Sequence, residues 1–124
     1  MADGLPPRAV VLFGHGSRDP LWRLPIEAVA ARMAVAEPQL TVRCAYLELS
    51  TPDLPTTVTK LAAAGVRSLT VVPMFLGVGK HAREDLPAIM AALAGAHPQL
   101  EFRLQPAVGE DPRVLDLLAD IARE

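Results

Sequence analysis

Two histidines and one glutamate stand where their side chains could bind a metal ion. His15 directly follows an apolar run at residues 9–14, His81 follows another run after a glycine-containing loop, and Glu48 lies two residues beyond a third. Imidazole is the commonest ligand for borderline metals such as cobalt, iron, nickel and zinc. Two histidines with one carboxylate therefore predict an open metal site, because a structural zinc site would be closed by four ligands. Taken singly, each histidine could instead be a capping or core residue, and Glu48 a solvated loop charge.

Basic residues gather near both histidines. Arg18 and Arg23 come after the first histidine, and Lys80 and Arg83 flank the second. Such a collar would attract a polycarboxylate, because ionised carboxylates pair well with Arg and Lys. A solvated rim would explain the same charges, and both interpretations stay open.

The glycine loops do not complete the fingerprints of other enzyme classes. A dinucleotide-binding loop would need a third glycine where Asp19 stands. A phosphate-binding P-loop would need glycine in place of Met74 and serine or threonine in place of His81. Ser17 is not at the centre of a Gly-x-Ser-x-Gly elbow, which argues against a hydrolase nucleophile.

The elements that must position these side chains alternate along the chain. Short apolar runs predict strands at residues 9–14, 41–46, 67–72 and 100–104. Segments with helical spacing predict helices at residues 20–36, 53–64, 84–94 and 112–123. This alternation predicts an α/β three-layer sandwich, with helices on both faces of a four-stranded parallel sheet. The expected strand order is 2-1-3-4, which brings both histidines and Glu48 to one edge at the switch point.

Proline and glycine mark the expected helix ends. Asp19-Pro20, Thr51-Pro52 and Asp111-Pro112 each predict an N-cap followed by proline at the first helical position. Pro87 is expected near the start of the third helix, where its missing N–H is not needed. Gly65 and Gly95 are expected to follow the second and third helices as C-terminal caps.

Composition and charge narrow the class of protein. The chain has 124 residues, of which 51% are hydrophobic and 21% charged, which predicts one domain over residues 1–124. The net charge of −2 argues against nucleic acid as a partner. Cys44 is the single cysteine and is expected to be a small buried residue. With neither a signal peptide nor an apolar stretch of membrane-spanning length, we expect a cytoplasmic protein with no membrane partner.

Several segments together resemble the short CbiX-type sirohydrochlorin chelatases. Residues 11–18 (VLFGHGSR) are similar to the opening of these proteins, and residues 72–76 (VPMFL) with 79–87 (GKHAREDLP) are similar to their second signature. Residues 46–48 (YLE) and 106–113 (PAVGEDPR) also resemble sequences found in this family. The resemblance covers nearly the whole chain, and two paired motifs at the expected spacing are more specific than either histidine alone.

The resemblance implies a class II chelatase fold and the insertion of a divalent metal into sirohydrochlorin. Cobalt is the first expectation, ferrous iron the second, and nickel would suit the same ligands. It implies that His15 and His81 bind the metal and assist deprotonation, with Glu48 as a third participant. No tightly bound cofactor is expected, because the metal is a substrate. We expect the tetrapyrrole to be bound by Ser17, Arg18, Lys80 and Arg83.

The resemblance also implies a homodimer whose two halves form the cleft. The pathway, whether to cobalamin or to sirohaem, is left open. Two other functions remain possible from the sequence alone. A carrier of metal or tetrapyrrole would bind its ligand without accelerating insertion. A phosphate-ester enzyme using the glycine loops is the weaker alternative, because the loop fingerprints are incomplete.

Overall fold

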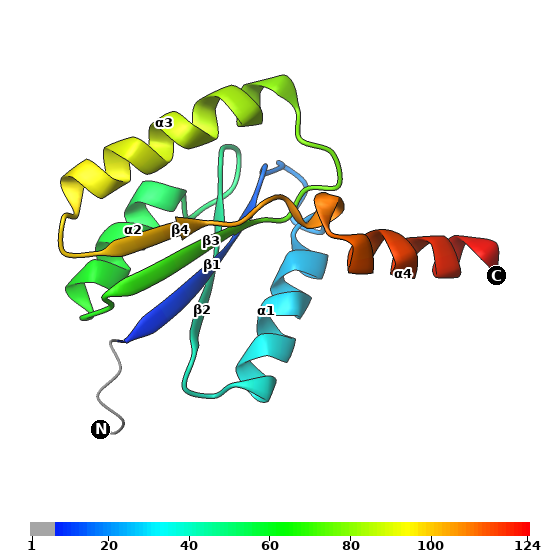
Figure 1. Cartoon of the computed structure of the whole chain (residues 1–124), viewed down its shortest axis with the longest axis horizontal. Coiled ribbons are helices and arrows are strands. Elements are labelled where there is room, and N and C mark those ends of the chain that lie inside the picture. The colour runs from blue at the N-terminus through cyan, green and yellow to red at the C-terminus, as the bar shows by residue number, and fades with distance from the viewer. Residues whose placement is uncertain (1–6) are drawn as a thin grey trace.

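Four parallel strands form one sheet in the order β2-β1-β3-β4, as the sequence predicts. The structure is a computed structural model that describes residues 7–124. The strands are β1 (Arg8–Gly14), β2 (Thr41–Tyr46), β3 (Ser68–Pro73) and β4 (Glu101–Leu104). Since β1 lies between β2 and β3, the segments that follow these three strands emerge at the same edge of the sheet (Figure 1).

Helices cover both faces of this sheet, which confirms the three-layer α/β architecture (Figure 1). Alternate residues of β1 point to opposite faces. Val11 and Phe13 pack with α2 (Leu54–Ala63) and α3 (Lys80–Ala96) in the larger core cluster. Val10 and Leu12 pack on the other face with α1 (Leu24–Ala36). Because both faces are buried, β1 consists of one continuous apolar run.

The first two helices begin later than the sequence predicts. Asp19 Oδ1 accepts a hydrogen bond from the Leu21 N–H at 2.9 Å, so Asp19-Pro20 forms a turn instead of capping a helix. The Thr51-Pro52 peptide bond is cis and also precedes its helix. The N-cap of α2 is Asp53, whose side chain accepts from the Thr56 N–H at 2.8 Å. In both places a polar residue followed by proline resembles a helix cap, but the helix begins a few residues later.

Helix α3 is longer at both ends than expected, since it runs from Lys80 to Ala96. The extended backbone of Gly79 lets the helix begin four residues before the predicted start at residue 84. Pro87 therefore lies inside the helix, on its exposed side, where water can satisfy the carbonyl group that a proline cannot bond. Gly95 is also helical and is not a C-terminal cap, whereas Gly65 does follow α2 with a φ of +96°.

The last helix, α4 (Pro112–Arg123), follows a short 3-10 helix η1 (Val108–Glu110) and projects away from the sheet (Figure 1). Asp111 caps it as predicted, by accepting from the Arg113 N–H at 2.9 Å. None of its residues is buried, so α4 does not share in covering the sheet as we expected. Within residues 7–124, no helix is long and apolar enough to cross a membrane.

Candidate active site

His15 leaves the sheet at the carboxyl end of the central strand β1. Phe13 and Gly14 before it are buried, whereas the His15 side chain is half exposed. A Cβ atom at Gly14 would lie 2.8 Å from Ile26 Cδ1 and 3.1 Å from Trp22 Cη2. Glycine is therefore needed for the start of α1 to pack against this strand end, and that packing fixes the point from which His15 extends.

Backbone hydrogen bonds join the segments that follow β1 and β2. The Leu47 N–H donates to the Gly14 carbonyl at 2.9 Å, and the Glu48 N–H donates to the His15 carbonyl at 3.1 Å. Gly16 has a φ of +104°, and a Cβ atom there would lie 1.6 Å from the Glu48 carbonyl oxygen. Only glycine permits this conformation and this approach. The two segments therefore form one tightly paired unit at the edge of the sheet.

This pairing brings the side chains of His15 and Glu48 together. Nε2 of His15 lies 3.3 Å from Oε1 of Glu48, and the two side chains are 50% and 53% exposed. Two ligand atoms that are each about 2.1 Å from one metal stand roughly 3.0 Å apart at octahedral angles and about 3.4 Å apart at tetrahedral angles. The observed separation falls between these values, so the pair can act as adjacent ligands of one ion or can share a proton.

Ser17 stabilises the loop after His15 through its backbone and its hydroxyl group. Its Oγ accepts from the Asp19 N–H at 3.1 Å. Ser50 Oγ accepts from the Ser17 N–H at 3.1 Å and donates to the Ser17 carbonyl at 2.8 Å. The neighbouring Arg18 is exposed. Of the two residues expected to bind substrate on this side, Arg18 is thus the one whose side chain faces solvent.

His81 is the second residue of α3 and does not lie in the preceding loop. Its side chain is exposed, as are those of Lys80 and Arg83 in the same turn. Across residues 7–124, no three His, Cys, Asp or Glu residues are grouped so that they could hold a metal. The expected convergence of His15, Glu48 and His81 on one ion is therefore not met within one chain. The early start of α3 accounts for this, because it places His81 on a helix instead of at a strand end.

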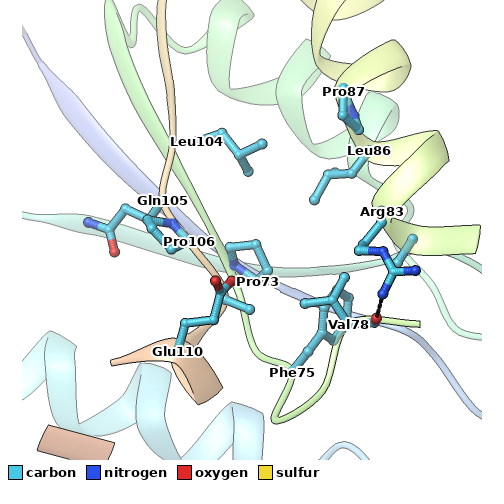
Figure 2. Close-up of a pocket in the computed structure, with 12 residues that line it drawn as sticks. Pro73, Phe75, Val78, Arg83, Leu86, Pro87, Leu104, Gln105, Pro106 and Glu110 are labelled. Carbon is cyan, nitrogen blue, oxygen red and sulfur yellow. Dashed lines mark hydrogen bonds between the residues drawn. The ribbon is translucent and has the colours of Figure 1, made fainter. Parts of the chain in front are cut away.

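A pocket that the sequence did not predict lies beside the first turn of α3. It has a volume of about 200 Å³, and Figure 2 shows apolar side chains pointing into it. Arg83 is at its rim, with Nη1 donating to the Val78 carbonyl at 3.1 Å. The apolar lining comes from α3 and from the ends of β3 and β4, and includes Pro73, Phe75, Leu86, Leu104 and Pro106. The signal available in the sequence was a proline at the end of each of these two strands, Pro73 in β3 and Pro106 after β4, with apolar residues beside it.

Tyr46 packs against the end of β1 that precedes His15. A Cβ atom built at Gly14 would lie 3.3 Å from Cδ1 of its ring. The ring also packs edge-on against Trp22, with ring centroids 6.0 Å apart. Burial raises the pKa of Tyr46 to about 12, and its Oη is buried without a hydrogen-bond partner among residues 7–124. Burial also raises the pKa of the Cys44 thiol. Neither group is therefore suited to proton transfer or thiolate chemistry near neutral pH.

The model of the CbiX protein family matches residues 9–124, which include every residue of this site. The chain belongs to the CbiX family. Similar curated proteins include the sirohydrochlorin cobaltochelatase of Methanopyrus kandleri, which is 39% identical over 140 aligned positions covering 94% of this chain and 95% of the relative. That of Methanothermobacter thermautotrophicus is 31% identical, over 93% of this chain and 90% of the relative.

Solved structures of similar proteins share the fold. A putative cobalamin biosynthesis CbiX protein from Marinobacter aquaeolei VT8 superposes with a TM-score of 0.82 at 33% identity, covering 94% of this chain and 95% of that one. The sirohydrochlorin chelatase SirB from Bacillus subtilis subspecies spizizenii, in complex with cobalt, has a TM-score of 0.74 at 25% identity. The match covers 94% of this chain but 50% of SirB, so this chain spans half of that protein's length.

Proposed function

We propose that this chain inserts a divalent metal, cobalt first and ferrous iron second, into sirohydrochlorin. The observation that carries the proposal is the His15–Glu48 pair, with Nε2 and Oε1 3.3 Å apart at the carboxyl edge of the sheet in a chain of the CbiX family. Two protein ligands leave most coordination positions of the ion to water. An ion held in this way can exchange its ligands one by one for the ring nitrogens, as a metal substrate must.

The carboxylated macrocycle binds along the same edge of the sheet. An apolar face of the ring packs over the pocket beside α3, while Arg18, Lys80 and Arg83 pair with its carboxylates. Arg83 is the best placed of these three, because its hydrogen bond to the Val78 carbonyl fixes the guanidinium at the pocket rim. Ser17 contributes through the loop that it stabilises.

Two pyrrole protons must leave the ring as the metal enters. His15, Glu48 and the exposed His81 are the groups that can accept them, because imidazole and carboxylate are the usual general bases in proteins. We assign His81 to the macrocycle, since it immediately precedes Ala82 and Arg83, which line the pocket. The metal reaches the ring from His15 and Glu48, and His81 acts beside the pocket that seats the ring.

A second copy of the chain completes the cleft in this proposal. The pocket volume of about 200 Å³ is below the roughly 300–1,000 Å³ of sites that enclose drug-sized ligands. The half-length match to SirB supports a homodimer in which each copy supplies one wall. We further propose that the chain acts as one domain, that it works in the cytoplasm, and that it has neither nucleic acid nor membrane as a partner.

An insertion assay tests the proposed reaction. Visible absorption of sirohydrochlorin is followed after addition of Co²⁺, Fe²⁺ or Ni²⁺, with and without the protein. His15→Ala and His81→Ala are expected to lower the rate at least about 100-fold, the scale of general acid–base catalysis. His97→Ala is the matched control, because His97 caps the opposite end of α3 from His81. Full activity in both variants would overturn the assigned roles.

The same assay separates the enzyme from a non-catalytic carrier. A carrier would change the absorption spectrum of sirohydrochlorin on binding, yet insertion would proceed at the spontaneous rate. The chelatase is expected to accelerate insertion under multiple turnover, with the metal that gives the highest kcat/KM identified as the preferred substrate. Binding without acceleration would favour the carrier.

A further inference from the structure

A second cavity lies between helix α2 and the outer edge of strand β2. Its volume is about 280 Å³, and it shares no lining residue with the pocket beside α3. The lining comes from β2, from α2 and from the segment between them, and consists of Arg43, Cys44, Pro52, Thr57, Lys60 and Leu61. Two of these residues are cationic and none is acidic. We name this space the β2-edge cavity.

The two cations of the cavity have no carboxylate partner. Among residues 7–124, neither Arg43 nor Lys60 forms an ion pair, although both are exposed. Nη1 of Arg43 donates to the Val42 carbonyl at 2.8 Å, and this bond holds the guanidinium at the strand edge. Its remaining N–H groups are therefore available to an anion, and Lys60 supplies a second positive charge from α2.

The backbone of β2 adds a third donor. Strand β2 has a neighbouring strand on one side only, and successive N–H groups of a parallel strand point alternately to its two sides. The Tyr46 N–H points away from β1, since it donates to the Pro52 carbonyl at 3.0 Å. The Cys44 N–H, two residues earlier, therefore points to the same outer edge, while the Cys44 side chain packs with the cluster beneath α1.

This edge suits a small anion better than an added β-strand. A further strand would also have to bond to the Val42 carbonyl and the Tyr46 N–H, and both groups are already bonded within the chain. An anion needs only the Cys44 N–H and the two cations. The cavity volume is several times the roughly 30 Å³ that one water molecule occupies, so it exceeds the needs of an inorganic ion.

We propose that the β2-edge cavity binds a small organic carboxylate. Arg43, Lys60 and the Cys44 N–H hold the carboxylate group, and an apolar part of the ligand lies against Pro52 and Leu61. A planar carboxylate matches the planar fork of the guanidinium, which favours it over a simple point charge. The proposal is independent of metal insertion, because neither the His15–Glu48 pair nor the pocket beside α3 takes part.

Titration of the ¹⁵N-labelled protein with benzoate tests the site. The Cys44 amide signal is expected to shift more than any amide signal outside the cavity, whereas benzamide, the neutral analogue, should leave it in place. Arg43→Gln and Lys60→Gln should each weaken benzoate binding at least about 10-fold, because each removes a charged donor. Arg32→Gln is the matched control, since Arg32 is also exposed and its Nη1 also donates to a backbone carbonyl, at 3.2 Å.

Several results would overturn the site. A Cys44 amide that does not move at millimolar benzoate excludes binding in the cavity. Equal weakening by Arg32→Gln indicates general attraction to surface charge, and equal shifts with benzamide indicate contact without recognition of the carboxylate. Inorganic phosphate that binds as tightly as benzoate would contradict the assigned ligand class. The comparison of benzoate with benzamide uses the unmodified chain, so it holds even if a variant does not fold, and it requires neither metal nor tetrapyrrole.

Discussion

Gly16 is the residue on which the geometry of the His15–Glu48 pair depends. The backbone of Glu48 passes so close to Gly16 that any side chain would collide with a carbonyl oxygen, which cannot rotate away. The positive φ of +104° adds a second requirement for glycine. The geometry of the pair that we propose to bind the metal is thus set by a residue that bears no side chain.

Gly16→Ala is expected to separate the two loops and to destabilise the fold by more than about 1 kcal/mol. Cobalt affinity, measured by calorimetric titration, should fall because His15 and Glu48 no longer meet at 3.3 Å. Gly77→Ala is the control, since nothing lies within 4 Å of a Cβ atom built there. Wild-type cobalt affinity in Gly16→Ala would show that the pair does not bind the metal.

Tyr46→Phe is expected to leave stability unchanged or to raise it by about 1 kcal/mol. The substitution removes a buried hydroxyl that has no partner among residues 7–124 and keeps the ring against Trp22. Urea unfolding measures the change, with insertion activity as the second readout. A loss of stability would mean that the Tyr46 hydroxyl has a bonding partner in solution.

Part of this site could be predicted from the sequence because strand order decides which loops meet. His15 and Glu48 follow neighbouring strands, so the order of the strands is enough to predict that they approach each other. His81 differs, because its position depends on where a helix begins, and Gly79 allows α3 to start earlier than the acidic residues at 84–85 suggest. The pocket beside α3 depends on side-chain packing between three elements, which spacing alone does not describe.

At the scale of elements, strands were predicted more accurately than helix ends. A fully buried parallel strand such as β1 is marked by one continuous apolar run, and all four expected strands form within one residue of the expected bounds at each end. Helix ends depend on single residues whose chemistry also suits turns. Asp19 illustrates this ambiguity, because its side chain caps a turn with the same kind of hydrogen bond that Asp53 and Asp111 make at true helix starts.

Gly95→Ala distinguishes a helical residue from a cap at the end of α3. Since Gly95 is within the helix and has open space at its Cβ position, alanine should stabilise the protein by about 0.5–1 kcal/mol. Thermal unfolding measures the gain. Gly65→Ala is the contrasting variant and should destabilise, because Gly65 has a φ of +96°. A loss of stability in Gly95→Ala would place a left-handed cap there instead.

At the scale of the whole molecule, the chain is an α/β sandwich with one helix left outside it. The sequence predicted α4 as an element, but no local signal states whether an amphipathic helix packs on its own sheet or on another chain. The direction of α4 is set by the segment before it, where η1 and the Asp111 cap turn the chain away from the sheet. The tertiary placement of α4 was therefore beyond prediction from periodicity.

Leu117→Asp is expected to convert the proposed dimer into monomers. Leu117 is a 60% exposed apolar side chain, and its loss from the proposed homodimer interface would cost about 2 kcal/mol in each copy, so dimerisation should weaken roughly 1,000-fold. Sedimentation velocity measures the change, and insertion activity should fall with it if two chains form the cleft. Val35→Asp controls for added surface charge. A Leu117→Asp protein that sediments like the wild type would leave α4 without a role in assembly.

The close approach of Gly109 to Leu76, whose carbonyl oxygen would lie 1.9 Å from a Cβ atom at Gly109, limits how the segment leading to His81 can move. Because Phe75 and Leu76 are held against η1, the first half of the connection from β3 to α3 has no independent freedom. The stretch from Gly77 to Gly79 is held through a side chain instead, by the hydrogen bond from Arg83 to the Val78 carbonyl, and no atom lies within 4 Å of a Cβ built at either glycine. Any gate that admits a macrocycle past His81 is therefore a short flap hinged at Leu76, and not a lid formed by the whole loop.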